Sequence, residues 1–514
     1  MALKSKLLLV ALLLSVLFLS VYVASATQDP ELKQCRHQCE HQQGFDSKQR
    51  EQCEQGCDKY IKQKREEEKH RRKSEGGGSF YPISETGRAQ EEEEEFQGRQ
   101  QQDQNPYFFE DEHFETRVQT EEGRFQLLQK FTERSDLLRA IENYRIGFLV
   151  TKPHAFVAPS HFDADTVLFV FQGRPAVTIV RGEKRETHNL EHGDLFRIPA
   201  GTPVYMVNRD ENEKLFIVNF MKPVSVPGEY EAFYAAGGEN PESFFKAFSP
   251  QVLQAALKTE INKLERLFGQ QRQGSITRAS KEPIKKLSQQ HGQGGSEGFL
   301  PFHGGQSSSD AFNLFSKHPS QANKFGRLFE ADFNDFKQLQ DLDLLVSFAN
   351  ITQGAMVGPY FNSRATKISF VLDGEGYFEM ACPHVSSTGR QEPQPQPEQQ
   401  PQPQQRRKSS PRYQKISGNL RRGAVFVAPA GHPMTAIASR NSNLQIICFE
   451  VNAHDNIRVP LVGKKNVVSQ FDREAKELAF NVPAREVDRI FNNQDDEFFF
   501  EGPNEQPEHG RAYA

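Results

Sequence analysis

A thiol and an imidazole stand two residues apart in the second half of the chain, at Cys382 and His384. Side chains at this spacing in a β-strand point to the same face, so the pair can offer its sulfur and nitrogen atoms together. A third candidate ligand is His432, which lies in the turn sequence Ala-Gly-His-Pro. Because a thiolate with two imidazoles suits copper, these residues predict a copper site with a structural or redox role.

Simpler roles for the same residues stay open. Cys382 could form a disulfide with Cys448 or remain a buried free thiol, and both histidines could be ordinary surface residues. Cys448 lies in the apolar sequence LQIICFEV, where a buried free thiol is the more natural interpretation.

Four other cysteines form two pairs near the N-terminus, Cys35 with Cys39 and Cys53 with Cys57. Each spacing places both sulfurs on one face of a helix, and the intervening Gly-Phe-Asp at 44–46 predicts a turn that folds the two helices back on each other. Among the three possible pairings we expect the antiparallel one, Cys35–Cys57 with Cys39–Cys53. A zinc site is the alternative, but zinc pairs usually have shorter gaps and a secretory route favours oxidation.

The first 26 residues have the pattern of a secretory signal peptide. Lys4 and Lys6 precede a long apolar run, and Ala-Ser-Ala at 24–26 ends it. A transmembrane anchor is the alternative, but the small residues at the exit and the polar sequence that follows favour cleavage after Ala26. No other apolar run is long enough to span a bilayer, so we expect a secreted chain without a membrane partner.

One site of modification follows from the secretory route. Asn350-Ile351-Thr352 is the only Asn-x-Ser/Thr sequence with a permitted middle residue. Asn350 is therefore a candidate glycosylation site. Its apolar neighbours predict a strand, so the sequence leaves open whether Asn350 carries a glycan or not.

The composition argues against some classes of partner. The formal net charge is only −5 over 514 residues, which indicates neither a nucleic-acid partner nor an anionic membrane. Tryptophan is absent and sulfur-containing residues are scarce, whereas glutamine, glutamate and arginine are abundant, so the chain is rich in nitrogen. Residues 62–104 are almost wholly charged or glutamine and predict a disordered linker after the cysteine hairpin at 27–61.

The candidate copper ligands belong to a repeated strand pattern. Runs of β-branched and aromatic residues alternate with glycine and proline turns in Pro159–Gly173 and Gly193–Asn208, and we expect a hairpin from each stretch. The same frame recurs in Gly358–Gly374 and Gly423–Met434. The repeat predicts a part of a small β-barrel in each half of the chain.

The glycine and proline positions of this frame resemble the two motifs of the cupin family, whose members hold a metal with histidines and a glutamate. The places of those ligands hold Pro159, His161, Thr166 and Val204 in the first copy and Tyr360, Asn362, Lys367 and Met434 in the second. A single imidazole cannot hold a catalytic metal that takes three or four ligands. The resemblance therefore implies two barrels that have lost the metal of the family.

The repeat divides the chain into two modules of similar build, 105–268 and 309–495, separated by a mobile connection at 269–308. A low-complexity loop at 385–413 interrupts the second module, and 496–514 forms a C-terminal tail. Each module ends where the apolar period changes from two to nearly four, which predicts a helical arm with an apolar stripe. The stripe residues are Leu253, Ala256, Leu257, Ile261, Leu264, Leu267 and Phe268 in the first arm and Leu478, Val487, Ile490 and Phe491 in the second.

Signal peptide, cysteine hairpin, charged linker and double frame occur in the order found in the vicilins, the 7S seed storage globulins, which the chain resembles over essentially its whole length. The resemblance implies a mainly β fold of two jelly-roll barrels, each followed by a helical arm, in a flat homotrimer. It implies a non-catalytic reservoir of nitrogen and carbon, held in the protein storage vacuole and digested later by vacuolar proteases. It also implies that Tyr107 completes the copper ligand set, and that the cysteine hairpin is similar to leader repeats that some relatives release as antimicrobial peptides.

Two other functions are compatible with a secreted cupin. A metal-dependent enzyme is disfavoured by the lost ligands, since Lewis-acid catalysis needs a metal held at an open position. A sugar-binding protein, related to the sucrose-binding proteins of seeds, is harder to separate, because Tyr360 and Phe361 could form either a sugar platform or part of the core.

Overall fold

The computed structural model describes residues 105–237, 240–289, 310–384 and 413–504, which all lie in one unit of the chain, Glu91–Ala514. The predicted signal peptide, the hairpin with Cys35, Cys39, Cys53 and Cys57, the charged linker and nearly all of the low-complexity loop lie outside the described residues.

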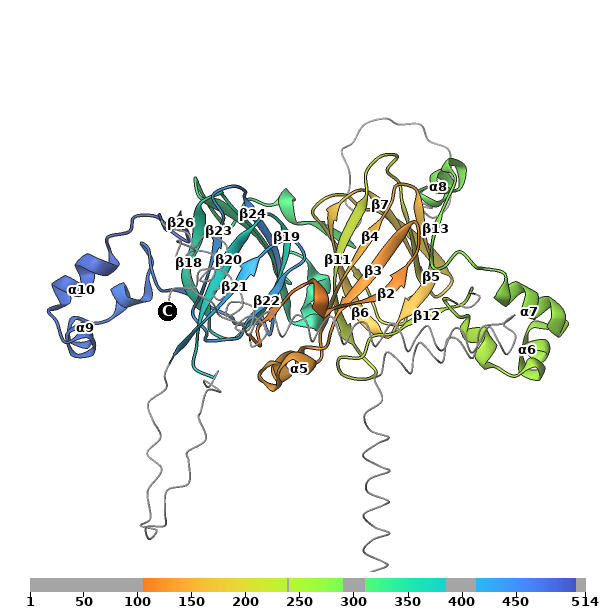
Figure 1. Cartoon of the computed structure of the whole chain (residues 1–514), viewed down its shortest axis with the longest axis horizontal. Coiled ribbons are helices and arrows are strands. Elements are labelled where there is room, and N and C mark those ends of the chain that lie inside the picture. Colours follow the sequence, from red (N-terminus) through yellow and green to blue (C-terminus); the bar gives the residue numbers. More distant parts are fainter. Residues whose placement is uncertain (1–104, 238–239, 290–309, 385–412, 505–514) are drawn as a thin grey trace, which may run out of the picture. The chain divides into compact units, whose positions relative to one another are not determined.

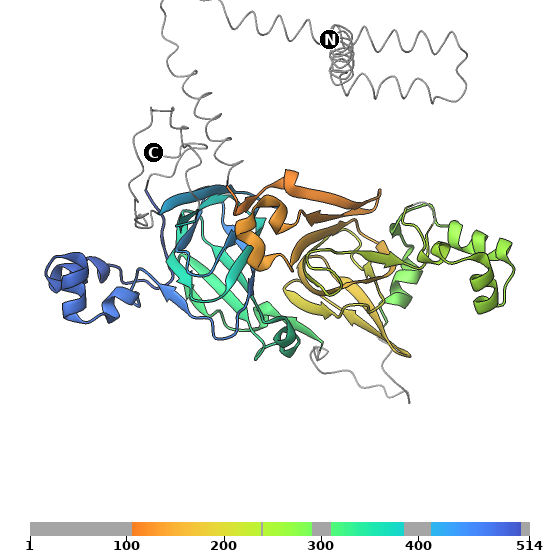
Figure 2. The ribbon, with the colours of Figure 1, turned by 90° about the horizontal axis from the view of Figure 1, so that it is seen from below.

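Module one consists of two antiparallel sheets whose strands curve into a barrel (Figures 1 and 2). The larger sheet has the order β14 (Ala311–Asn313), β9 (Asp194–Ile198), β6 (Ala164–Gln172), β11 (Leu215–Pro223), β4 (Arg145–Thr151), β3 (Gly123–Leu128) and β2 (Phe114–Gln119). The smaller sheet has the order β12 (Ala232–Tyr234), β5 (Ala155–Phe162), β10 (Val204–Asn208), β7 (Pro175–Arg181) and β8 (Lys184–Asn189), with β13 (Ile276–Arg278) paired to β5. Apolar side chains from both sheets, among them Val177, Phe196 and Ile217, fill the space between them.

Module two repeats this architecture. Its larger sheet has the order β1 (Phe108–Phe109), β22 (Val425–Ala428), β19 (Thr366–Asp373), β24 (Leu444–Val451), β17 (Leu344–Ile351), β16 (Gly326–Ala331) and β15 (Gln321–Asn323). Its smaller sheet has the order β21 (Gln414–Leu420), β20 (Gly376–Cys382), β23 (Met434–Ala438), β18 (Ala355–Asn362) and β25 (Arg458–Pro460), with β26 (Phe499–Glu501) paired to β18. The mainly β fold with two barrel modules is therefore confirmed.

The two modules exchange edge strands. Strand β1 lies at the start of the sequence range of module one (105–268) but pairs with β22 of module two, whereas β14, at the start of the range of module two (309–495), pairs with β9 of module one. The large sheets also share a continuous apolar core, in which the rings of Phe220 and Phe449 stack with centroids 5.2 Å apart. Burial of this shared aromatic surface is the dominant favourable term that holds the modules together.

The paired motifs do not fold as the hairpins we expected. Strand β5 pairs with β10 of the other motif, and β6 pairs with β9. The first motif therefore crosses from one sheet to the other at Asp163, and the second crosses between Ile198 and Val204. The two motifs nevertheless pair with each other, as we expected. The glycines of their frame occupy turns, where their positive φ angles let the chain reverse. Gly374, for example, has φ +86°, and a Cβ atom there would lie 1.8 Å from the carbonyl oxygen of Asn443.

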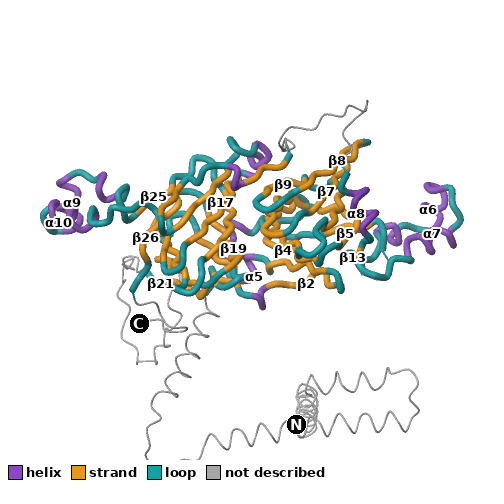
Figure 3. Tube along the Cα trace, turned by 90° about the horizontal axis from the view of Figure 1, so that it is seen from above, coloured by secondary structure: helices purple, strands orange, loops and turns teal. Residues whose placement is uncertain are grey.

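Each helical arm is two short helices rather than one striped helix. The first arm contains α6 (Pro250–Leu257) and α7 (Ile261–Gly269), separated at Lys258, which has a left-handed φ of 49°. The second contains α9 (Arg473–Phe480) and α10 (Ala484–Phe491), separated at Asn481. Figure 3 shows these helices apart from the strands of the barrels. No helix in the described part of the chain is long and apolar enough to cross a membrane.

Short helices connect the strands elsewhere in both modules. They are the α-helices α5 (Phe131–Arg134) and α8 (Lys281–Leu287) and the 3₁₀ helices Asp111–His113, Asp136–Ile141, Phe244–Ala247, Leu314–Ser316, Lys337–Leu342 and Val467–Gln470.

Two boundaries of the predicted domains are wrong. The start of the expected mobile connection at 269–308 contains β13 and α8, which belong to module one because Ile276 is buried in its barrel and Ile284 packs with Ala176 and Val207. The expected C-terminal tail begins with strand β26, whose Phe499 is fully buried. Isolated isoleucines hold the first segment, and the adjacent buried residues Phe499 and Phe500 hold the second. The polar composition around them conceals this in the sequence.

Candidate functional site

The structure brings Cys382 and Tyr107 together although they are 275 residues apart in the sequence. Side chains of β20 alternate between buried and half-buried, and Cys382 is the last of its buried residues. Tyr107 directly precedes β1, so the pairing of β1 with β22 places its ring beside the end of β20. The Cys382 thiol donates a hydrogen bond of 3.7 Å to the Tyr107 hydroxyl. Burial, followed by this hydrogen bond, raises the pKa of Tyr107 well above its usual value.

The two histidines of the predicted site lie beside this pair. The centroid of the His432 ring lies 6.1 Å from that of Tyr107 and 5.3 Å from that of His384. His432 Nδ1 lies 3.1 Å from the carbonyl oxygen of Ala430, while Nε2 is buried without a hydrogen bond of normal geometry. Burial by itself would lower the pKa of His432, but interactions with Cys382 and with nearby carbonyl groups outweigh it, and the pKa is raised.

The four residues are of types that bind copper, and their side chains are neighbours. Their ligand atoms, however, are not all within bonding distance of a single ion position in this structure. In the described ranges, one group of three histidine, cysteine or carboxylate ligand atoms lies within 4.8 Å of one another, and it does not include Cys382, His384 or His432. His384 is exposed, so its ring is free to rotate toward the buried Cys382 and His432. The buried, unsatisfied Nε2 of His432 is the feature that a ligand at this place would explain.

The disulfide between Cys382 and Cys448 is not formed. Both cysteines are buried free thiols, as the apolar sequence around Cys448 predicted. Cys448 lies in β24, paired with Ser347 of β17 and Ser369 of β19, and is therefore held inside the barrel of module two.

The former cupin ligand places of module one are not grouped as a site. His161, the only imidazole among them, is half-buried and stacks on Phe233 with ring centroids 5.0 Å apart and planes 8° apart. Pro159 is exposed, whereas Thr166 and Val204 are buried. A stacked imidazole without a second ligand from these places cannot bind a catalytic metal.

The former ligand places of module two contain an ion network that the sequence analysis missed. Lys367, which takes the place of the cupin glutamate, is directly opposite Glu450 across β19 and β24, with Nζ 2.6 Å from Oε1. Arg458 links the same carboxylate, at 3.4 Å, to Glu330, at 2.6 Å, and Asn362 Nδ2 donates to Glu450 Oε2 at 3.0 Å. The sequence does contain a sign of this network: KISFVL and LQIICFEV are largely apolar strands, yet the first contains a lysine and the second a glutamate.

Mutual attraction decides the charge state of this buried pair. Burial by itself would raise the pKa of Glu450, but Lys367 and Arg458 lower it below the usual value. Burial likewise opposes the charged form of Lys367, but Glu450 raises the pKa of the ammonium group above its usual value. The second barrel thus holds an internal cation where the cupin fold otherwise holds a metal.

Asn350 lies in β17, as its neighbours predicted, between Arg327 of β16 and Gln445 of β24. Its side chain is half-buried, and Oδ1 is buried without a hydrogen bond. Because the backbone is paired on both sides, a glycan would have to be attached before this sheet forms. Glycosylation of Asn350 stays a prediction.

Comparisons with known proteins agree with this architecture. The family model described as Cupin matches residues 145–264 and 312–488, which defines a protein with two cupin regions. A vicilin of Juglans regia is 57% identical over 517 residues, covering 100% of both chains. A sucrose-binding protein of Glycine max is 46% identical over 471 residues, covering 90% of this chain and 85% of that protein. The crystal structure of vicilin from Corylus avellana has a TM-score of 0.69 at 60% identity and covers 78% of this chain and 100% of that one. The chain therefore belongs to the vicilins, the 7S seed storage globulins of the cupin family.

Proposed function

We propose that this vicilin acts as a non-catalytic reservoir of nitrogen and carbon, delivered by the secretory pathway to a storage vacuole and digested there later. The observation that carries the non-catalytic part is the replacement of the cupin metal ligands by Lys367, Tyr360, Asn362 and Met434. A buried ammonium paired with Glu450 has no open coordination position, so it cannot act as a Lewis acid. Immunogold labelling of developing and germinating seeds tests the proposal: label in storage vacuoles that is lost on germination supports it, and persistent label elsewhere contradicts it.

The storage form is a homotrimer held by the helical arms. The arms expose apolar side chains that a monomer would leave in water, with Leu478 86% and Ile490 68% exposed. Further exposed apolar residues of the arms are Phe248, Val252, Leu257, Leu267, Phe471, Phe480 and Val482. Insertion of each arm against the next subunit would cover these surfaces in a closed ring, whereas a lone chain would leave them exposed. Sedimentation equilibrium measures the mass directly, and a value equal to one chain contradicts the trimer.

Sugar binding is the competing function, because one relative is named a sucrose-binding protein. The aromatic residue best placed to form a platform, Tyr360, is buried and lies beneath Lys367, Arg458 and Phe498. A covered ring cannot stack on a sugar without opening the ion network. Equilibrium dialysis with labelled sucrose distinguishes the two functions, since saturable binding would favour the sugar-binding role.

The vicilin also has a copper site formed by Cys382, His384, His432 and Tyr107. The grouping of these side chains from the N-terminal arm, the end of β20 and the turn before β23 supports this proposal. Bound copper would supply one-electron redox chemistry, while the protein would hold it with the buried Cys382 and His432 and the exposed His384 beside them. Metal analysis of protein purified without chelators is the test. Copper in wild type but not in Cys382→Ser supports the site, and equal copper in both removes it.

A further inference from the structure

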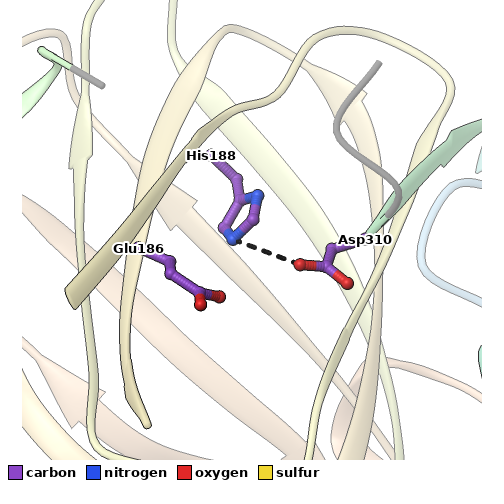
Figure 4. Close-up of side chains that lie close together, drawn as sticks. All are labelled: Glu186, His188 and Asp310. Carbon is purple, nitrogen blue, oxygen red and sulfur yellow. Dashed lines mark ion pairs between the residues drawn. The ribbon is translucent and has the colours of Figure 1, made fainter. Parts of the chain in front are cut away.

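The one close group of candidate metal ligands in the described residues lies in module one, away from the copper candidates. It contains Glu186 and His188 of β8 and Asp310, which directly precedes β14, and their ligand atoms all lie within 4.8 Å of one another (Figure 4). Glu186 and His188 are two residues apart in a strand and therefore present their side chains to the same face. Asp310 comes from a distant part of the sequence and faces them because β14 pairs with β9.

The hydrogen bonds of Asp310 leave one carboxylate oxygen directed at the histidine. Gln338 Nε2 donates to Asp310 Oδ1 at 2.9 Å, and this bond fixes the orientation of the carboxylate. The other oxygen, Oδ2, lies 3.9 Å from His188 Nε2. The His188 ring packs on Phe196 with centroids 4.8 Å apart, which restricts its rotation. Fixed orientation of ligands by neighbouring groups is a general property of metal sites.

The repeat of the fold places this group at the counterpart of the Tyr107 and Cys382 position. Phe108 pairs with Phe426, three residues after Gly423, and Ala311 pairs with Phe196, three residues after Gly193. The residues that precede these edge strands, Tyr107 and Asp310, are therefore equivalent.

The hairpins give a second correspondence. The amide of Val180 donates to the carbonyl of Pro203, and that of Ala381 donates to the carbonyl of Pro433. Arg181 thus takes the place of Cys382. Both modules gather ligand-type side chains where an incoming edge strand meets the end of a hairpin.

We propose that Glu186, His188 and Asp310 bind a divalent metal ion of the zinc class, which ties the segment before β14 to strand β8. Zinc accepts imidazole nitrogen and carboxylate oxygen together, and the absence of a sulfur ligand in this group makes it unsuited to copper(I). Tetrahedral ligands with bonds of about 2.0 to 2.1 Å lie roughly 3.3 Å apart, so modest side-chain rotations close the group around an ion. The fourth position would be taken by water.

Arg181 is the group that competes with the metal. Its Nη1 atom lies 3.4 Å from Glu186 Oε2 and 3.7 Å from Asp310 Oδ2, so the guanidinium balances both carboxylates when no ion is bound. A divalent ion at the same place must displace this cation. Removal of the guanidinium should therefore tighten metal binding, an effect that damage to the fold cannot imitate.

The experiment is a calorimetric titration of chelator-treated, full-length protein with Zn²⁺, in a Cys382→Ser background that removes the thiolate of the other site. We expect His188→Gln and Asp310→Asn each to weaken binding at least about 100-fold, because even changes to residues behind the ligands cost about 10- to 100-fold. His161→Gln, which removes a half-buried histidine of the same module outside the group, should bind as the background does. Arg181→Gln should bind more tightly.

A second readout identifies the ligands. Co²⁺ at a site of imidazole and carboxylates gives weak visible bands without the near-ultraviolet charge-transfer band of a thiolate, and His188→Gln should remove those bands. Unchanged Zn²⁺ affinity in His188→Gln, or weaker binding in Arg181→Gln, would overturn the proposal.

Discussion

Lys367 Nζ lies 2.6 Å from Glu450 Oε1, and the two residues are directly opposite each other on β19 and β24 inside the second barrel. Both side chains are almost fully buried. A buried carboxylate without a matched cation is strongly destabilising, whereas a hydrophobic pair of similar size can replace a buried ion pair with little loss.

Replacement of Lys367 alone should therefore be much worse than replacement of the pair. We expect Lys367→Met to lower the free energy of unfolding by about 3 to 5 kcal/mol, and Lys367→Met with Glu450→Met to recover most of that loss. Denaturant unfolding followed by circular dichroism measures both. Lys415→Met, which removes an exposed partner of Glu379, is the control and should change stability by less than about 1 kcal/mol. Equal losses in the single and double variants would contradict the role of the pair.

The same pair should make the protein sensitive to acid. The folded pKa of Glu450 is lowered, so the unfolded chain takes up a proton first as the pH falls. The stabilisation is complete above the unfolded pKa of glutamate, about 4.3, and is lost as the pH falls from there through the folded pKa. The melting temperature of the wild type should fall more steeply than that of the double methionine variant between pH 5 and the onset of acid unfolding. Parallel melting curves would show that this pair does not contribute.

Charge on the arms should dissociate the trimer. Leu478→Asp with Ile490→Asp introduces two carboxylates into surfaces that the proposed assembly buries, where unpaired charges are costly. We expect the variant to sediment as a folded monomer. Leu137→Asp alters a leucine that is also exposed but lies outside the arms, and it should leave the mass unchanged. A trimer in the double variant would show that the arms are not the interface.

Processing should spare the segment that contains β1. We expect cleavage after Ala26 and loss of residues up to roughly Asp103, because charged linkers are preferred protease sites. Phe108 and Phe109 are fully buried in module two, and the loss of one such phenylalanine typically costs about 3 to 5 kcal/mol. A chain that begins at residue 105 should melt as the longer protein does, and one that begins at 111 should melt well below it. Mass spectrometry of seed protein that finds only chains starting at Met1 would contradict the cleavage.

Local sequence was sufficient to predict the strands and the candidate copper ligands. It was not sufficient to predict which strands pair or which side chains meet across the barrel. Periodicity located β5 and β6, yet it could not show that they pair with β10 and β9, because pairing depends on the path of the chain between sheets. Likewise, the cupin frame identified Lys367 as a lost ligand, whereas Glu450 is its partner only through the register of β24. Cys382 and His384 were predicted together because residues two apart need no tertiary information, but β20 ends at Cys382, so His384 lies beyond the strand and is exposed rather than buried beside the thiol.

The missed segments have a different cause. Strand β13 and helix α8 each depend on one buried isoleucine, Ile276 or Ile284, in a stretch rich in glutamine, serine and lysine. The average composition of this stretch is polar, so a single buried isoleucine does not change it, and the stretch was predicted to be a mobile connection. The group of Glu186, His188 and Asp310 was missed because Asp310 reaches module one only through the exchange of β14.

The exchange of edge strands also sets an order of events during synthesis. Phe108 and Phe109 leave the ribosome early, but their partners Phe426 and Val425 are made only near the end of the chain. At about 5 to 20 residues per second, the interval between synthesis of β1 and synthesis of β22 is on the order of tens of seconds. During this interval Phe108 and Phe109 have no partner strand to cover them. Strand β14 closes its own edge of module one as soon as the first residues after the connection emerge. The nascent chain therefore needs its N-terminal aromatic segment shielded, by a chaperone or by transient local contacts, until β22 has been translated.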